Sequence, residues 1–145
     1  MTAAAPRITH ILESSLYVAD LDRAQAFYER LFGFPAFMRD ARMCALAVPG
    51  RQVLLLFREG GSVTPSMTPG GMIPPHDAHG RQHLCFAIPG DSLAAWEARL
   101  ADHGIPIESR VDWSGRSVSL YFRDPDGHSL EVATPRLWPN DAGGG

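Results

Sequence analysis

The sequence has 145 residues with 45% apolar content, and its 13 Lys and Arg against 16 Asp and Glu give a net charge of -3. This length supports one shared hydrophobic core, and the lack of a basic run that could follow a phosphate backbone argues against a nucleic-acid partner. The longest apolar run, 53–57, is too short to cross a membrane and residues 1–6 lack the layout of a signal peptide, so we expect a cytoplasmic protein with no membrane partner.

Five segments are predicted along the chain. They are an N-terminal extension, a first module, a Gly/Pro-rich linker or lid, a second module and a C-terminal tail, at residues 1–7, 8–57, 58–80, 81–134 and 135–145.

The first module is predicted to begin with a strand at 11–18, followed by a helix. The helical pattern starts after Asp20 and stops at Gly33. An Asp can accept hydrogen bonds from the amides of the first turn, and a Gly can adopt the left-handed conformation that ends a helix. Two strands at 43–48 and 53–57 complete this module around a Pro-Gly turn.

An internal repeat predicts the same design for the second module. Asp91 and Gly104 have the same spacing as Asp20 and Gly33, and both glycines open a Gly-X-Pro-X sequence. The second helix should therefore begin after Asp91 and stop at Gly104.

The strands of the second module are predicted at 83–88, 117–123 and 129–133. The last two flank Asp-Pro-Asp-Gly at 124–127, which is strong turn chemistry because Pro presets the first bend and Gly accepts a positive φ. The linker interleaves Gly with Pro and is predicted to have no regular structure, as is typical of a linker, a lid or a mobile segment. His76, Asp77 and His79 cluster in it without a fixed geometry.

Strand alternation predicts a concave surface of small and polar side chains opposite the helices. Its members are Glu13, Ser15 and Tyr17 on the first strand, His83, Cys85 and Ala87 on the next, and Ser117, Ser119, Tyr121, Arg123, Ser129, Glu131 and Ala133 on the last two. Glu13, His83 and Glu131 lie at matched depth and could converge on one divalent cation. The alternative is that both glutamates are solvated and that His83 is a partly buried histidine with satisfied hydrogen bonds.

Three stretches carry a resemblance to a known family. They are LYVADL at 16–21 with FY at 27–28 and LFGF at 31–34, HLCF at 83–86, and YFRDPDGHSLE at 121–131. Together they resemble the vicinal oxygen chelate superfamily of glyoxalase I, extradiol dioxygenases, fosfomycin-resistance enzymes and bleomycin-binding proteins. The resemblance implies an α+β fold of two tandem βαβββ modules that form a concave mixed sheet with helices on its outer face. It also implies a homodimer whose cavity is completed by modules of both subunits.

The resemblance implies metal ligands at Glu13, His83 and Glu131, the residues that the alternation had selected. It also implies catalytic roles for Tyr121, as a substrate-contacting tyrosine, and for Ser15, as a hydroxyl residue. The alternative for Tyr121 is a half-buried strand aromatic. Candidate substrate-binding residues are the rim aromatics Tyr17 and Trp113, and Arg116, which could face an anionic substrate.

Three departures from the family narrow the prediction. The first-strand ligand is Glu13 rather than His, which disfavours Fe(II) ring-opening dioxygenase chemistry. The strand 53–57 offers no carboxylate for the fourth ligand of glyoxalase I, and the segment 112–116 lacks the Lys of the potassium loop in fosfomycin enzymes.

The sequence therefore predicts a divalent-metal-dependent enzyme that holds Mn(II), Fe(II), Ni(II) or Zn(II) and chelates two neighbouring oxygens of a small oxygen-rich molecule. The ion would stabilise a developing oxyanion in lyase, isomerase, thiol-transferase or oxygenase chemistry. The rival prediction is a metal-free protein of the bleomycin-resistance type, which only binds and sequesters a small molecule.

Overall fold

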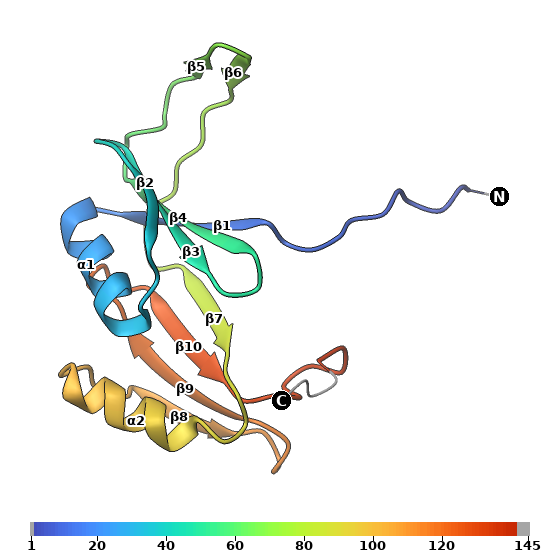
Figure 1. Ribbon diagram of the computed structural model, residues 1–145, viewed down its shortest axis with the longest axis vertical. Coiled ribbons are helices and arrows are strands. Elements are labelled where there is room, and N and C mark those ends of the chain that lie inside the picture. The colour runs from blue at the N-terminus through green and yellow to red at the C-terminus, as the bar shows by residue number, and fades with distance from the viewer. Residues whose placement is uncertain (1, 142–145) are drawn as a thin grey trace.

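A computed structural model of the chain describes residues 2–141, so Met1 and residues 142–145, parts of the predicted extension and tail, lie outside the described residues. The elements are β1 (Glu13–Val18), α1 (Leu21–Phe32), β2 (Ala36–Arg39), β3 (Met43–Val48), β4 (Gln52–Arg58), β5 (Ser66–Thr68), β6 (Gly71–Ile73), β7 (His83–Ala87), α2 (Leu93–Asp102), β8 (Ser109–Asp112), β9 (Val118–Arg123) and β10 (Ser129–Ala133). The predicted α+β fold of two tandem βαβββ modules is confirmed (Figure 1).

Each module builds its own four-stranded mixed sheet with the same topology. The strand orders are β1-β4-β3-β2 and β7-β10-β9-β8, and in each sheet the first pair is parallel and the other pairs are antiparallel. The predicted concave surface is therefore divided between two sheets. None of the helices within residues 2–141 is long and apolar enough to cross a membrane.

One hydrophobic core lies between the sheets and the two helices. It joins apolar side chains of both modules, including Leu16, Tyr28, Leu54, Leu100 and Phe122, all at most 2% exposed. The apolar strand faces predicted from alternation pack into this core, and so the modules fold as one body rather than as two domains.

Hydrogen bonds from side chains, rather than a strand ladder, join the two sheets where β1 lies near β7. The buried imidazole of His128 accepts from the Gln82 backbone N–H at Nδ1 (2.9 Å) and donates from Nε2 to the carbonyl oxygen of Tyr17 (2.7 Å). The Gln82 side-chain oxygen in turn accepts from the Tyr17 N–H (3.0 Å). Asp126, in the turn that the sequence predicts at 124–127, also accepts from the Ala19 N–H of the first module (2.9 Å), so this turn and the adjoining His128 join the two modules.

The first helix has the predicted ends and the second does not. The Asp20 carboxylate accepts from the backbone N–H of Arg23 (3.1 Å), and Gly33 is left-handed with φ 74°. The predicted Asp91 cap is wrong, because α2 begins after Ser92, whose amide is already held by the carbonyl of Pro89. The helix is capped at its other end by His103, and the left-handed Gly104 follows.

This difference predicts unequal effects of two matched substitutions. We expect Asp20→Ala to lower the free energy of unfolding by about 1 kcal/mol, because it removes an N-cap hydrogen bond. Asp91→Ala should change it by less than about 0.5 kcal/mol, because Asp91 is exposed and caps nothing. Urea denaturation of both variants measures the two values, and equal losses would contradict the assignment of the caps.

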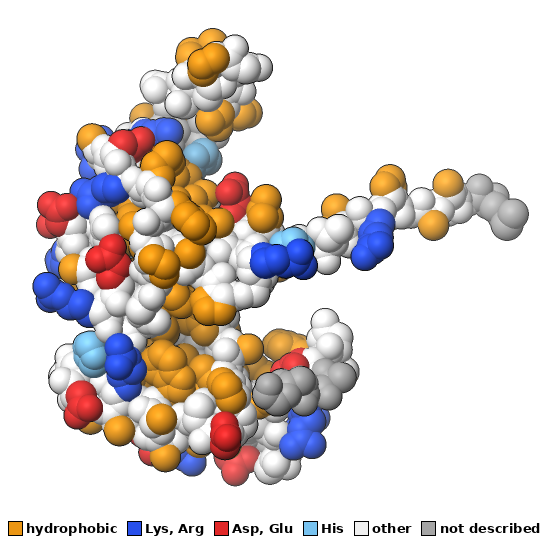
Figure 2. Space-filling model, in the orientation of Figure 1, with side chains coloured by type: hydrophobic (Ala, Val, Ile, Leu, Met, Phe, Trp, Pro, Cys, Tyr) orange, Lys and Arg blue, Asp and Glu red, His pale blue; other side chains and the backbone are white. Residues whose placement is uncertain are grey.

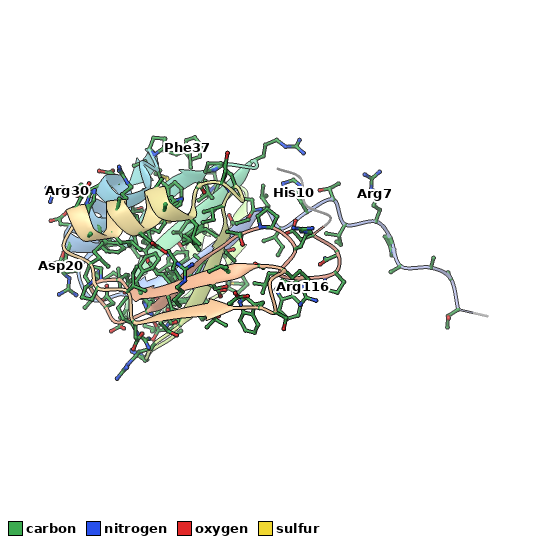
Figure 3. The ribbon with its side chains drawn as sticks, turned by 90° about the horizontal axis from the view of Figure 1, so that it is seen from below. Arg7, His10, Asp20, Arg30, Phe37 and Arg116 are labelled. Atoms are coloured by element: carbon green, nitrogen blue, oxygen red, sulfur yellow. The ribbon has the colours of Figure 1, made fainter. Side chains whose placement is uncertain are left out.

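Two further expectations are corrected by the structure. The linker is not without regular structure, because β5 and β6 form a hairpin in which the Thr68 hydroxyl donates to Gly71 O and accepts from Gly71 N–H. The first strand begins at Glu13 rather than at residue 11, and residues 2–12 extend away from the body as an arm that carries Arg7 and His10 (Figures 1 and 3).

Candidate functional site

The eight predicted site residues divide between two cavities, one over each sheet. We call the first the β1 cavity; it has a volume of about 650 Å³ and is lined by Glu13, Ser15, Tyr17, Phe37, Met38, Arg42, Met43, Ala45, Val53, Leu55, Phe57, Ile73 and His76. We call the second the β10 cavity; it has a volume of about 490 Å³ and is lined by His83, Cys85, Trp113, Arg116, Tyr121, Glu131, Leu137 and Trp138. In Figure 3, Phe37 of the first set lies well away from Arg116 of the second.

The His83 imidazole in the β10 cavity is oriented by the backbone. Its Nδ1 lies 2.8 Å from the carbonyl oxygen of Ser129, and because a carbonyl only accepts, Nδ1 carries the proton. Nε2 faces the carboxylate of Glu131 at 3.3 Å. A metal-ligating histidine is usually held in this way, with one nitrogen bound to a backbone oxygen and the other free for the ion.

The Glu131 carboxylate is oriented by a chain of hydrogen bonds. Glu131 is 3% exposed, and the fully buried hydroxyl of Ser119 donates to its Oε2. The Trp113 indole N–H donates to the same hydroxyl (2.9 Å). Trp113 therefore lines the cavity and also supports the orientation of Glu131. The other carboxylate oxygen of Glu131, Oε1, points toward His83.

Tyr121 and Cys85 flank Glu131 on the neighbouring strands. Tyr121 is its partner on β9 and Cys85 its partner on β7, while the Tyr121 ring stacks on His83 at 6.2 Å. Burial and the Glu131 carboxylate raise the pKa of Tyr121, and burial and the same carboxylate raise the pKa of Cys85 to about 12. Both groups therefore stay protonated at neutral pH, so Tyr121 can donate a hydrogen bond into the cavity.

The β1 cavity has an apolar floor, which corrects the prediction of a small and polar concave face. Three rows cross its sheet: Glu13 beside Val53, Ser15 beside Leu55 and Ala45, and Tyr17 beside Phe57 and Met43. Because the run at 53–57 is apolar on both faces, alternation could not predict which of its side chains face the core and which face the cavity. Leu55 also occupies the place in its sheet that Glu131 has in the other, so the first module adds no second carboxylate.

The sequence did not predict the roles of three residues in or beside these cavities. Ser119 was placed on the concave face without its role toward Glu131, and Arg42 gave no signal because it precedes a predicted strand. His76 was noticed in the linker, but only the structure places its Nδ1 2.6 Å from the Tyr17 hydroxyl.

Within one chain the structure brings His83 and Glu131 together and places Glu13 in the other cavity. Among residues 2–141, no three His, Cys, Asp or Glu side chains form a group that could hold a metal ion. The described residues of one chain therefore bring together two of the three predicted ligands.

Comparison with known proteins identifies the family. The sequence pattern of the Glyoxalase/Bleomycin resistance protein/Dioxygenase superfamily matches residues 7–132, nearly the full chain. The chain belongs to this superfamily. The superfamily is the one that the motifs at 16–34, 83–86 and 121–131 resemble, and that prediction is confirmed.

Individual relatives carry several different activities. Catechol-2,3-dioxygenase of Bacillus subtilis is 31% identical over 94% of this chain, which spans only 46% of that protein. Metallothiol transferase FosB of Bacillus licheniformis is 30% identical over 88% of this chain and 74% of its own. The crystal structure of a lactoylglutathione lyase from Agrobacterium tumefaciens is 34% identical, with a TM-score of 0.83 over 92% of this chain and 99% of its own.

Proposed function

We propose that the protein is a divalent-metal-dependent enzyme that acts on a small oxygen-rich molecule. Glu13, His83 and Glu131 would hold the ion, and the protein would work as a homodimer. Relatives named as a dioxygenase, a metallothiol transferase and a lyase support the class of chemistry without selecting one reaction.

The observation that carries the proposal is the prearranged pair of His83 and Glu131. Ser129 fixes the tautomer of His83, and Ser119 fixes one carboxylate oxygen of Glu131, so both free donor atoms face the same point. Partners of this kind around ligating groups are what metal sites require.

Burial supports a cation at this point rather than a simple ion pair. Glu131 is almost fully buried, and taking a carboxylate out of water costs several kcal/mol unless a full charge opposes it. Within residues 2–141 the ion-pair partner of Glu131 is His83, whose side chain is half exposed to solvent and carries a positive charge only when protonated. A divalent ion would compensate the buried charge.

The position of Glu13 supports a site made by two chains. It lies over the first sheet, in the β1 cavity, while the other two donors lie over the second. The arm and the hairpin expose apolar side chains that a second copy would cover, among them Ile8, Ile11, Leu12, Met67, Met72 and Ile73 (Figure 2). We therefore propose that Glu13 of one subunit completes the donor set of His83 and Glu131 in its partner.

The other cavity residues would bind and orient the substrate. When bound, the metal supplies Lewis-acid polarisation of substrate oxygens. The protonated Tyr121 hydroxyl would donate to a substrate oxygen that gains negative charge, and Arg116, which is exposed, would attract an anionic group. Ser15 would add a hydroxyl from the opposite sheet, and Trp113 would keep Glu131 in place.

A heterodimer experiment tests both the ligands and their distribution over two chains. Subunits with Glu13→Gln and with His83→Ala are co-expressed with different tags, purified as heterodimers and loaded with Mn(II). We expect each homodimer to bind no ion and the heterodimer to bind one, because one of its two sites combines the intact Glu13 with the intact His83 and Glu131. Elemental analysis measures the ratio.

The remaining outcomes of this experiment are equally informative. A heterodimer without metal, beside a wild-type dimer with two ions, would show a site contained in one chain. A wild type that binds no Mn(II), Fe(II), Ni(II) or Zn(II), or that remains a monomer by light scattering, would overturn the proposal in favour of metal-free binding.

A further inference from the structure

We propose that the end of the β1 cavity remote from Glu13 is a binding subsite for an acidic group, made by Arg42, Tyr17 and His76. The substrate would then be elongated, with chelating oxygens at the Glu13 end, an apolar middle and a carboxylate at the other end. The assignment of the Glu13 end rests on the proposed function, whereas the acidic subsite rests on this chain's own geometry.

The length of the cavity follows from the strand that lines it. Glu13, Ser15 and Tyr17 project from the same face of β1 and all line the cavity. A strand rises about 3.3 Å per residue, so the backbone positions of Glu13 and Tyr17 are roughly 13 Å apart. A ligand that reaches both ends must therefore be elongated.

The middle of the cavity suits an apolar chain or ring. Its floor is the cluster of Met43, Ala45 and Phe57 with Val53 and Leu55 beside them, and Ser15 is its one hydroxyl side chain between the two ends. Apolar surface buried on such a floor contributes about 25 cal/mol per Å². Apolar contacts in the middle of the cavity would not fix the direction of a ligand, so the polar groups at the two ends of the cavity have to orient it.

Arg42 is positioned at the remote end by a hydrogen bond rather than by an ion pair. One guanidinium nitrogen donates to the hydroxyl of the buried Ser62 (3.1 Å), and the side-chain stem lies so close to Gly61 that an added Cβ there would be 3.0 Å from Arg42 Cγ. No carboxylate of residues 2–141 forms an ion pair with Arg42. A guanidinium held in this way, without an ion-pair partner, is suited to binding a carboxylate.

Tyr17 and His76 add hydrogen-bonding groups to this end. The Tyr17 hydroxyl and His76 Nδ1 share a hydrogen bond of 2.6 Å, and His76 packs its ring edge against Phe57 with centroids 4.5 Å apart. Burial and the Asp77 carboxylate raise the pKa of Tyr17, so its hydroxyl stays protonated. In the tautomer of His76 in which Nδ1 accepts from this hydroxyl, Nε2 carries the proton and is a further donor.

The acidic groups near this end are occupied by the backbone. Asp40 Oδ1 accepts from the N–H groups of Arg42 and Met43 (2.8 and 2.9 Å), and Asp77 Oδ1 accepts from Gly60 N–H (3.1 Å). Neither carboxylate lines the cavity, where Glu13 at the opposite end is the acidic side chain. The two ends of the cavity therefore carry opposite charge, which sets the direction in which a ligand binds.

A pair of matched probes tests the subsite in metal-free protein. Octanoate and octanamide have the same apolar chain and differ in the charge of the polar end. We expect calorimetry to show octanoate binding more tightly by roughly tenfold to a hundredfold, the range of a hydrogen bond to a charged group. Arg42→Gln should remove this preference and leave the affinity for octanamide unchanged, and Tyr17→Phe should reduce the preference less.

Two further arginine variants test whether the preference for octanoate arises at Arg42. Arg30→Gln removes the same charge from the outer face of α1 and should keep the preference, which excludes a change in net charge as the cause. Equal binding of the two probes, no measurable binding of either, or a preference abolished by Arg116→Gln instead of Arg42→Gln would overturn the proposal. Because no metal is present, a protein that fails the heterodimer experiment can still pass this one, and the two proposals fail separately.

Discussion

Replacing the Glu131 carboxylate by an amide is expected to change the stability of the protein in opposite directions with and without metal. In chelator, Glu131→Gln should melt above wild type, because the wild-type carboxylate is buried as an anion while Gln still accepts from Ser119. With Mn(II) a hundredfold above its dissociation constant, wild type should gain about 2.7 kcal/mol and the variant should gain almost nothing. Scanning calorimetry in the two buffers measures the reversal.

Two variants control this experiment. Glu108→Gln removes an exposed carboxylate that pairs with Arg123 and should not alter the response to metal. His83→Ala should lose the response without the gain in chelator, because it removes a ligand and leaves the carboxylate buried. A wild-type melting temperature that is the same with and without Mn(II), Fe(II), Ni(II) or Zn(II) would contradict the metal site.

The contrast of β7 and β10 with β4 explains which parts of the site could be predicted from the sequence. In β7 and β10 the two faces differ in chemistry, and alternation places His83 and Glu131 on the same concave face, as the structure has them. In β4 both faces are apolar, so the pattern could not predict the apolar floor made by Val53, Leu55 and Phe57.

The separation of Glu13 from the other two donors could not be predicted either. Matched depth on a strand is a local property, whereas the distance between two modules depends on how their edges are joined. The structure joins them through Gln82 and His128 rather than through a continuous ladder, and this leaves one cavity over each sheet.

The turn and cap residues of the sequence also predicted only part of the local structure. The repeated Asp and Gly predict both helices, yet the Pro-Gly turn before α2 moves its cap from Asp91 to Ser92. The sequence at 124–127 predicts a turn and gives no sign that Asp124 binds the hydroxyl of Tyr28 in the other module. Long-range partners of this kind leave no periodic pattern in the sequence.

That contact between modules leads to the largest expected loss of stability. Asp124 is 5% exposed; its Oδ2 accepts from the Tyr28 hydroxyl (2.7 Å), and its Oδ1 accepts from the N–H groups of Asp126 and His128 (both 2.9 Å). Asp124→Ala would leave a fully buried hydroxyl and two amides without their acceptor, and each buried unsatisfied group costs about 1–3 kcal/mol. We expect the free energy of unfolding to fall by about 3–5 kcal/mol, a large fraction of the usual total for a domain.

A double-mutant cycle separates this contact from the rest of the turn. Tyr28→Phe removes one donor and should cost about 1–3 kcal/mol, mostly because the carboxylate loses a partner. In the Asp124→Ala background the same change should cost much less, because the acceptor of the hydroxyl is already absent. Asp102→Ala, at the exposed end of α2, is the matched control and should have almost no effect. Additive losses from Tyr28→Phe and Asp124→Ala in urea denaturation would show that the buried contact does not couple the two modules.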